Sequence, residues 1–439
     1  MTTADTYNRR RLFWIGLIAL FTAGMSASLR ATIAGDIKTD YLDALDLLNS
    51  GKMIAEALGV SFLGFAITLF ISSPLLDTIG MKRMLALAAT GFIAGSGLIA
   101  TAPILFDGPA VYTAIWAGML LSGIGWGGVE ATINPMTTAL YPEEKTHRLN
   151  VLHAWWPAGI IVGGLLGVGL GSMGASWQLL ILLVAIPAVI FTVMCKGTAF
   201  PKTERAEAGI PASEMFKEVI RRPSFLIWFA LMFLTAATEL APGQWVDIAL
   251  SKVAGMRGIL ILVYVSGLMF VMRHFAGPLV HRLSNPGLLM ISSLLACMGL
   301  YMLSAATGPA SIFVAATLWG IGVCYMWPTM LASVAERFPR GGSWMIGLLG
   351  SAGALSIYFI LPILGTVYDR AKIDAAGGAN AFAGLTGEAL DTVLITAASQ
   401  SFETVAVIPA VLVVLFAAVW ISDKRKSTQS DANPASEEA

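Results

Sequence analysis

Hydrophobic residues along this chain gather into long, continuous runs separated by short polar stretches. A helix needs about 20 apolar residues to cross the hydrocarbon core of a bilayer. Because the runs are continuous and lack the two-residue alternation of a membrane β-barrel, we expect helices. They predict twelve membrane-spanning segments, near residues 12–37, 52–76, 84–106, 111–140, 149–171, 177–195, 224–246, 259–281, 286–306, 310–337, 342–367 and 401–421.

Polar interruptions divide these spans six and six. The longest one inside the bundle is residues 196–223, and its end, PASEMFKEVIRR, carries a helix-capping signal at Ser213 that predicts a short helix at the membrane surface. A second loop, near residues 368–400, is rich in Ala, Gly and Thr. The expected organisation is an N-terminal six-helix bundle (1–195), a cytoplasmic middle loop (196–223), a C-terminal six-helix bundle (224–421) and a disordered cytoplasmic tail (422–439).

Composition supports a membrane protein and excludes several other classes. Of the 439 residues, 56% are hydrophobic and 12% are charged, whereas soluble domains average about 25% charged residues. The net charge of zero gives no sign of a nucleic-acid partner. Because Cys195, Cys297 and Cys324 lie in apolar runs without CxxC or Cys/His spacing, we expect no metal, cofactor or disulfide. HExxH, GxxxxGK[ST] and a readable Ser/His/Asp set are absent from the sequence, so we expect a protein that is not an enzyme.

The distribution of Lys and Arg predicts the orientation in the membrane. On the side of the N-terminus lie 19 of these residues, against 6 on the opposite side. Basic residues are in excess in cytoplasmic loops, so both termini and the middle loop are expected in the cytoplasm. The N-terminus runs into the first span without a small-residue cleavage site, so we expect that span to be retained. The prediction is a multi-pass protein of the cell inner membrane.

The two halves of the sequence are similar to each other. The turn after the second span reads SPLLDTIGMKR (73–83), and the turn after the eighth reads GPLVHRLSNPG (277–287). Spans four and ten contain GIGW (123–126) and GIGV (320–323), which lie 197 residues apart. Repeats of this kind are typical of secondary transporters and predict two pseudo-symmetric six-helix bundles.

The turn SPLLDTIGMKR resembles the G-x-L-x-D-R-x-G-R-R/K-R signature of the major facilitator superfamily. The matching positions are Leu75, Asp77, Gly80, Lys82 and Arg83. The resemblance implies the twelve-helix major facilitator fold and a gating role for Asp77, Gly80 and Arg83. A carboxylate at such a turn can meet helix N-terminal amides and a basic partner, and so hold the inner gate in one state.

Residues 128–159, GVEATINPMTTALYPEEKTHRLNVLHAWWPAG, are similar to the fucose/glucose/galactose proton symporter family. The matching positions are Glu130, Asn134, Pro135, Arg148, Leu149, Asn150 and Gly159, with Arg273 matching in a segment of helix eight. The resemblance assigns proton coupling and sugar contact to Glu130. The family's helix-one aspartate has Arg30 in its neighbourhood here, and its helix-five Gln and Asn are His153 and Trp156, which leaves the solute open.

An ionisable side chain at membrane depth is costly, so it points to function. The candidates well inside the spans are Arg30, Glu130, His153, Glu239, Arg273 and His274. On a helix, Trp126, Glu130 and Asn134 share one face. An apolar environment favours the protonated carboxyl group, so Glu130 is the candidate for loading and releasing a proton. The alternative is a structural carboxylate bonded to Arg30 or to the backbone.

The remaining charged candidates have alternative readings. Arg30 could pair with Glu130, bind an anionic group of the solute, or extend its charged end to the outer surface. Glu239 and Gln244 flank Pro242 and Gly243, which are expected to break helix seven. Both side chains are therefore candidates for hydrogen bonding to the solute, and the alternative for Glu239 is an ion pair with Arg273. Because Arg273 lies near the inner end of helix eight, we expect it to make gate contacts.

Aromatic residues complete the predicted binding site. His153 and Trp156 lie one turn apart, and an aromatic face beside polar donors suits a sugar ring. The same face suits a nucleoside or an aromatic acid. Tyr325 on helix ten is a further candidate for the lining of the site.

These features predict a secondary active transporter that couples protons to the symport of a sugar or sugar-like solute by alternating access. The expected partners are the small-molecule solute, protons and the lipid bilayer, with no nucleic acid, and we expect the monomer to function. Two alternatives remain open. One is an organic-anion carrier that binds a carboxylate or phosphate ester through Arg30, and the other is a solute sensor that does not transport.

Overall fold

The computed structural model describes residues 7–142, 145–207, 209, 211–273, 282–338 and 342–432. Over these residues the chain is helical and contains no β-strand. Eleven helices are long and apolar enough to cross a bilayer, and the shorter apolar helix Ile259–Arg273 is the twelfth. The prediction of an all-α membrane protein with twelve spans is confirmed.

The first six spans form the N-terminal half. Their helices are α1 (Arg9–Ile37) with the short continuations η2 (Lys38–Leu42) and α2 (Asp43–Asp46), α3 (Ser50–Ile79), α4 (Met81–Leu105), α5 (Pro109–Leu140), α6 (Lys145–Ser172), and the pair α7 (Trp177–Leu182) and α8 (Ala185–Cys195). The last six spans form the C-terminal half. Their helices are α11 (Phe225–Ala254), α12 (Ile259–Arg273), α14 (Asn285–Ser304), the pair α15 (Pro309–Val323) and α16 (Met326–Arg337), α17 (Gly342–Ala375) and α19 (Gly387–Ala432).

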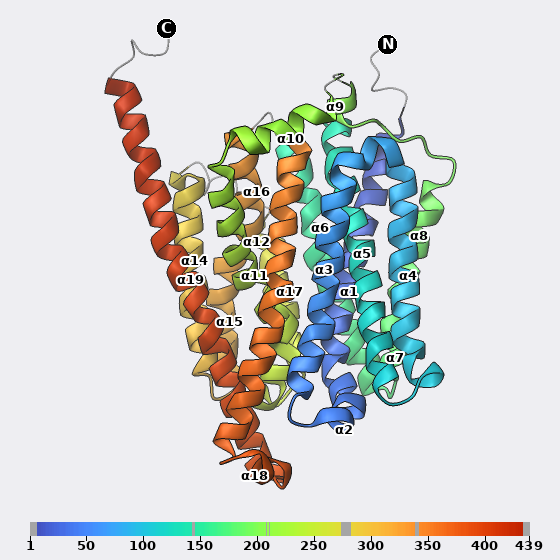
Figure 1. Ribbon diagram of the computed structural model, residues 1–439, viewed down its shortest axis with the longest axis vertical. Coiled ribbons are helices and arrows are strands. Elements are labelled where there is room, and N and C mark those ends of the chain that lie inside the picture. Colours follow the sequence, from blue (N-terminus) through green and yellow to red (C-terminus); the bar gives the residue numbers. More distant parts are fainter. Residues whose placement is uncertain are drawn as a thin grey trace.

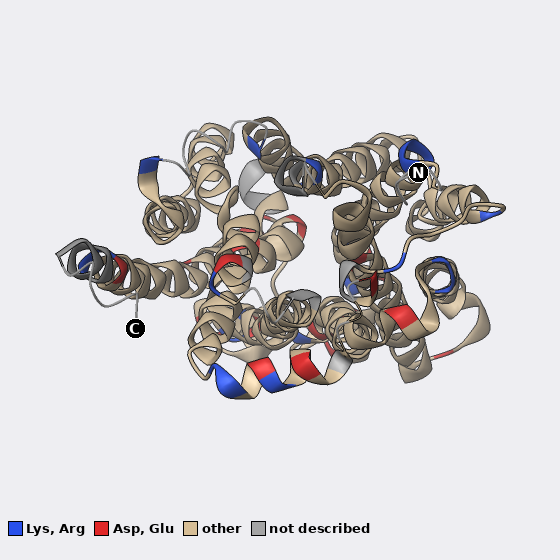
Figure 2. Cartoon of the chain, turned by 90° about the horizontal axis from the view of Figure 1, so that it is seen from above, with Lys and Arg blue, Asp and Glu red and all other residues tan. Residues whose placement is uncertain are grey.

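The two halves stand side by side. The start of α1 and the end of α19, here called the chain ends, lie at the same end of the bundle (Figure 1). Seen from that end, the helices form two groups on either side of the centre (Figure 2). Contacts between the halves join α3 to α17, α6 to α12 and α1 to α11. Side chains on the facing sides of these helices therefore lie at the interface between the halves, which changes if the halves rock against each other.

Glycines let the helices of the N-terminal half approach closely. Gly123 and Gly127, one turn apart on α5, both face α3, where an added methyl group would overlap the carbonyls of Ser61 and Phe65. Small residues at this spacing allow close packing between membrane helices. The packing fixes the depth and rotation of α5, and with them the direction of Glu130, one turn further on.

The expected break at Pro242 is wrong, because α11 continues from Phe225 to Ala254 with Pro242 inside it. Proline lacks the N–H that would bond the carbonyl four residues earlier, which here belongs to Thr238. Trp319 of α15 donates its indole Nε1–H to that carbonyl at 3.2 Å. A neighbouring helix thus supplies the missing hydrogen bond and keeps α11 continuous.

The predicted loops contain more helix than expected. The loop at 368–400 is mostly helical, because α17 extends to Ala375, α18 covers Ala379–Ala383 and α19 begins at Gly387. Its alanine content favours helix. The tail expected to be disordered is helical over residues 422–432, since no glycine or proline interrupts that stretch, and residues 433–439 lie outside the described part.

The predicted surface helix in the middle loop forms as α10 (Ala212–Arg221), which follows the four-residue helix α9 (Glu204–Glu207). It begins one residue before Ser213, with Pro211 at the N-cap, because the extended backbone of this proline leads directly into the helix. Helix α10 lies across the end of the bundle that carries the chain ends (Figure 1). Its Phe216 contacts Trp344 of α17, with ring centroids 5.1 Å apart.

Candidate functional site

A chain of polar side chains links α5 to α6. Asn134 Nδ2 donates to Glu130 Oε2 at 3.0 Å, across one turn of α5. Asn134 Oδ1 lies 2.9 Å from His153 Nε2 on α6. Since the amide nitrogen donates to Glu130, the amide oxygen must accept, and His153 Nε2 therefore carries a hydrogen. All three side chains are half-buried. Helical spacing placed Glu130 and Asn134 on one face of the helix, and the fold adds both hydrogen bonds.

Two tryptophans stack beside this chain. The rings of Trp126 (α5) and Trp156 (α6) lie 4.6 Å apart at an interplanar angle of 19°. Phe65 on α3 backs Trp126 at 4.4 Å. Trp126 is buried, and its Nε1–H has no hydrogen-bond partner among the described residues. The half-buried Trp156 therefore presents an aromatic surface that the packing behind it holds rigid.

A second polar cluster lies in the C-terminal half. Glu239 on α11 forms an ion pair with Arg273 at the end of α12, with Oε1 and Nη2 3.4 Å apart and both side chains buried. Glu239 Oε2 also accepts from the backbone N–H of Trp327 at 3.1 Å. Arg273 further donates to the carbonyls of Cys324 at 3.1 Å and His153 at 3.4 Å. Arg273 thus contacts the middle of the bundle, and its ion pair with Glu239 is the alternative that the sequence offered for that acid.

Arg30 on α1 is buried, with 1% of its surface exposed. Its Nε donates to the carbonyl of Ser26 at 3.1 Å, and its Nη1 has no partner. Within the described part of the chain no acidic residue pairs with it, so the pairing with Glu130 considered from the sequence is not formed. A buried guanidinium without a counter-ion is costly, which makes Arg30 a candidate for binding an external group.

The other two predicted lining residues differ in what they can offer to a solute. Gln244 is buried on α11, and its Oε1 has no partner among the described residues. Tyr325 is buried as well, but its hydroxyl donates to the carbonyl of Met272 at 3.0 Å. Gln244 therefore keeps an acceptor for a ligand, whereas the hydroxyl hydrogen of Tyr325 already has a structural partner.

The turn between α3 and α4 carries the motif SPLLDTIGMKR. Gly80 has φ +87°, a value that favours glycine, and it separates the two helices. Asp77 accepts from Thr203 of the middle loop, through its N–H at 3.1 Å and its hydroxyl at 2.7 Å. The side chain of Arg83 is exposed. The turn is therefore fastened to the middle loop. His274 lies outside the described residues.

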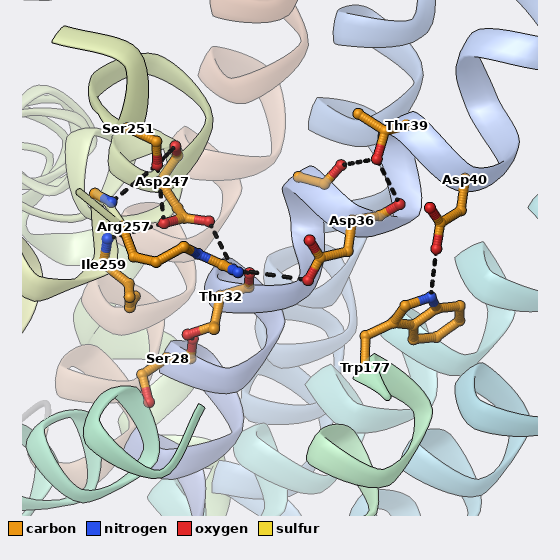
Figure 3. Close-up of polar contacts among 12 residues, drawn as sticks. Ser28, Thr32, Asp36, Thr39, Asp40, Trp177, Asp247, Ser251, Arg257 and Ile259 are labelled. Carbon is orange, nitrogen blue, oxygen red and sulfur yellow. Dashed lines mark hydrogen bonds and ion pairs between the residues drawn. The ribbon is translucent and has the colours of Figure 1, made fainter. Parts of the chain in front are cut away.

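The sequence missed a cluster at the opposite end of the bundle (Figure 3). Arg257, just before α12, lies 3.2 Å from Asp247 Oδ2 on α11 and 3.7 Å from Asp36 Oδ2 on α1. It also donates to the carbonyl of Thr32 on α1. The buried carboxylate of Asp247 in turn accepts from Ile259 N at 3.0 Å. This cluster joins the two halves at the end away from the chain ends.

Removing this connection should open that end of the bundle. We expect Arg257→Gln to raise the population in which the end is open about fivefold, since a charged hydrogen-bonded contact contributes about 1 kcal/mol or more. The measurement is the distance between spin labels at the exposed positions Ala44 and Ala375, one on each half. Lys52→Gln is the matched control, because Lys52 pairs with Glu56 inside α3. An unchanged distance distribution in Arg257→Gln would contradict this role.

Twelve spans in two halves, with ionisable side chains between them, define a membrane transporter. The family profile of the Major Facilitator Superfamily matches residues 12–362, and the chain belongs to this superfamily. No curated protein sequence matches the chain.

Solved structures share the fold at low sequence identity. The xylose transporter XylE from E. coli, in a partially occluded inward-open conformation, has a TM-score of 0.69 at 13% identity, covering 92% of this chain and 96% of that one. The human organic anion transporter MFSD10 has a TM-score of 0.64 at 14% identity, covering 93% and 99%. A bacterial homologue of the human lysosomal transporter Spinster, in an inward-facing conformation, has a TM-score of 0.69 at 14% identity, covering 96% and 99%.

Proposed function

We propose that this protein is a secondary active transporter that carries a sugar or sugar-like solute together with protons, by alternating access. The observation that carries the proposal is the hydrogen-bonded chain Glu130–Asn134–His153 beside the stacked Trp126 and Trp156. A sugar presents an apolar C–H face for an aromatic ring and hydroxyl groups for amide, imidazole and carboxyl groups. A sugar therefore uses both the aromatic face and the polar groups of this site.

Glu130 has the properties that a coupling group needs. Its carboxylate accepts a hydrogen bond from Asn134 and has no cationic partner among the described residues. Protonation would therefore neutralise an uncompensated charge in the membrane interior. A solute hydroxyl that enters the chain next to Asn134 or His153 would compete for the same hydrogen bonds, which links solute binding to the protonation of Glu130.

The charge asymmetry between the loops supports an orientation with both chain ends in the cytoplasm of an inner-membrane protein. In this orientation the cluster around Arg257 closes the outer end, and the turn at Asp77 lies at the inner end. The protein would take up its solute from outside and run the cycle as a monomer.

Transport by purified protein in proteoliposomes tests the proposal. A panel of sugars and polyols, with nucleosides and organic acids for comparison, is first screened by thermal shift, since binding to the folded state raises its stability. Uptake of each hit is then measured with and without an inward proton gradient. Gradient-driven accumulation of a sugar supports the proposal, and binding without accumulation of any solute identifies a sensor.

The buried guanidinium of Arg30 favours a second candidate, an organic-anion carrier. For a solute with a carboxylate or phosphate, Arg30→Gln is expected to weaken binding about 30-fold or more, because truncating one partner of a buried charge pair typically costs 2 kcal/mol or more. A neutral sugar should lose less than about tenfold in affinity. Titration calorimetry measures the affinity of an anion and of a neutral sugar for the wild-type protein and for Arg30→Gln. An anion that binds Arg30→Gln with unchanged affinity excludes the anion carrier.

A further inference from the structure

Arg273 is bound by three different parts of the structure at once. Its Nε donates to the carbonyl of Cys324, between α15 and α16, at 3.1 Å. Its Nη2 faces Glu239 on α11 at 3.4 Å. Its Nη1 donates at 3.4 Å to the carbonyl of His153 on α6, which belongs to the other half. The side chain is 7% exposed, so these contacts occur away from water.

Both carbonyls that Arg273 reaches lie four residues before a proline. Pro157 follows His153 within α6, and Pro328 follows Cys324 at the start of α16. A proline has no N–H to donate to the carbonyl four residues earlier. In the membrane interior an unpaired carbonyl is costly, and water is not there to satisfy it. The guanidinium fork, with donors in fixed directions, can supply both missing bonds together.

Glu239 completes the arrangement on the side of the C-terminal half. Its second oxygen accepts from the N–H of Trp327, in the first turn of α16. Arg273 therefore satisfies the carbonyl that ends α15, and Glu239 satisfies an amide that begins α16. A carboxylate at a helix N-terminus is favoured by the helix dipole as well. The ion pair of Glu239 and Arg273 thus holds the interrupted helix α15–α16 inside one half.

The contact with His153 is different, because it crosses between the halves. Its length is 3.4 Å, whereas the contacts of Arg273 with Cys324 and Glu239 stay within the C-terminal half. It is therefore the bond of this set that breaks when the halves separate. His153 also holds Asn134 through its imidazole. His153 thus joins the polar chain of Glu130 through its side chain, and it contacts Arg273 of the opposite half through its backbone carbonyl.

We propose that Arg273 is a positioning residue of the transport cycle, which fastens the two halves to each other at mid-membrane by binding the carbonyl that Pro157 leaves unpaired in α6. The bond stabilises the arrangement of the halves in this structure, and its loss favours the arrangement in which the end near Arg257 opens. The inference rests on the alternating-access part of the proposed function, and it needs neither the solute nor the proton.

Repairing the helix tests the inference without removing Arg273. Pro157→Ala restores the N–H that can bond the carbonyl of His153 inside α6, so Arg273 gains less from crossing between the halves. Pro328→Ala makes the same repair at Cys324 within the C-terminal half and is the matched control. With spin labels at positions 44 and 375 in lipid nanodiscs, Pro157→Ala should raise the long-distance population roughly fivefold, and Pro328→Ala should leave it unchanged.

A double-mutant cycle distinguishes positioning from general stability. Lysine keeps the charge opposite Glu239 but lacks the fork that reaches both carbonyls. Arg273→Lys alone should therefore shift the distances as Pro157→Ala does, and in the Pro157→Ala background it should add little. Shifts that add independently would overturn the inference, and so would equal shifts from Pro157→Ala and Pro328→Ala. If Arg273→Lys does not fold, the comparison of the two proline variants still decides.

The measurement uses the protein without solute or gradient, so the two proposals fail separately. Absence of proton-driven sugar uptake, with the expected shift in Pro157→Ala, removes the proposed function and keeps the positioning role. Proton-driven uptake, with no shift in Pro157→Ala, keeps the function and removes the positioning role.

Discussion

Glu130→Gln is expected to abolish solute accumulation driven by a proton gradient while solute exchange at equal concentrations continues. Glutamine has nearly the same shape, and its amide oxygen can still accept from Asn134 Nδ2, which donates to Glu130 at 3.0 Å. The variant keeps the hydrogen-bonded chain to His153 but can no longer bind and release a proton. The halves should then move with the solute, as they do when the acid is protonated, and net coupling is lost.

Proteoliposomes give both readouts on one preparation. Accumulation is measured with an imposed inward proton gradient, and exchange is measured with labelled solute at equal concentrations on both sides. Glu56→Gln is the matched control. Glu56 on α3 is also half-buried, and it accepts a hydrogen bond from Tyr112 at 3.2 Å where α3 and α5 are in contact. Tyr112 lies near the start of α5, whereas Glu130 lies towards the end of that helix. Accumulation that survives in Glu130→Gln assigns coupling to another group.

The two acids in the middle of the bundle have different surroundings, which is why the prediction concerns Glu130. Glu239 faces a guanidinium and a helix N-terminal amide, so its charge is compensated in the resting structure. Glu130 accepts a hydrogen bond from the amide of Asn134 and has no cationic partner among the described residues. A group whose charge is not compensated has more to gain from a proton. Glu239 is better suited to holding Arg273 than to carrying protons in each cycle.

Contacts within one helix could be predicted from the sequence, because helical spacing is known in advance. The pairing of Glu130 with Asn134 and the packing of Gly123 and Gly127 against a neighbour follow from residues four apart on α5. The twelve spans follow from the length of each apolar run. These inferences require only the period of the α-helix and the thickness of the bilayer. They do not require knowing which helices are neighbours.

Most contacts between helices could not be predicted, although the ion pair of Glu239 with Arg273 was among the alternatives that the sequence offered. Pro242 leaves α11 continuous because Trp319, 77 residues later in the chain, satisfies the freed carbonyl. Arg273 was expected to make gate contacts because of its place near the end of a span, but its partners on α6 and at the α15–α16 junction could not be named from that place. Asp247 was missed because it comes just after the predicted end of span seven, where an acid is expected to reach water.

Trp156→Leu is expected to weaken solute binding about 30-fold with a much smaller effect on folding. Truncating a buried aromatic anchor typically costs 2 kcal/mol or more, which corresponds to that factor. Trp156 stacks on Trp126, and Phe65 holds Trp126 from behind, so leucine removes the ring face without disturbing its support. Binding is measured by titration calorimetry with the solute found in the screen, and KM is measured in proteoliposomes.

Trp155, the neighbour of Trp156 in the sequence, provides the control for the predicted effect of Trp156→Leu. Trp155 turns away from the stack, and its ring lies edge-on to Trp14 and Phe21 of α1, at 5.5 Å and 6.3 Å. Trp155→Leu removes the same side chain from the same turn of α6, so it should lower stability while leaving affinity within about twofold to threefold. Equal losses of affinity in both variants would mean that the helix, rather than the face of Trp156, determines binding. A loss confined to Trp156→Leu places the solute against the stacked pair, within reach of Asn134 and His153.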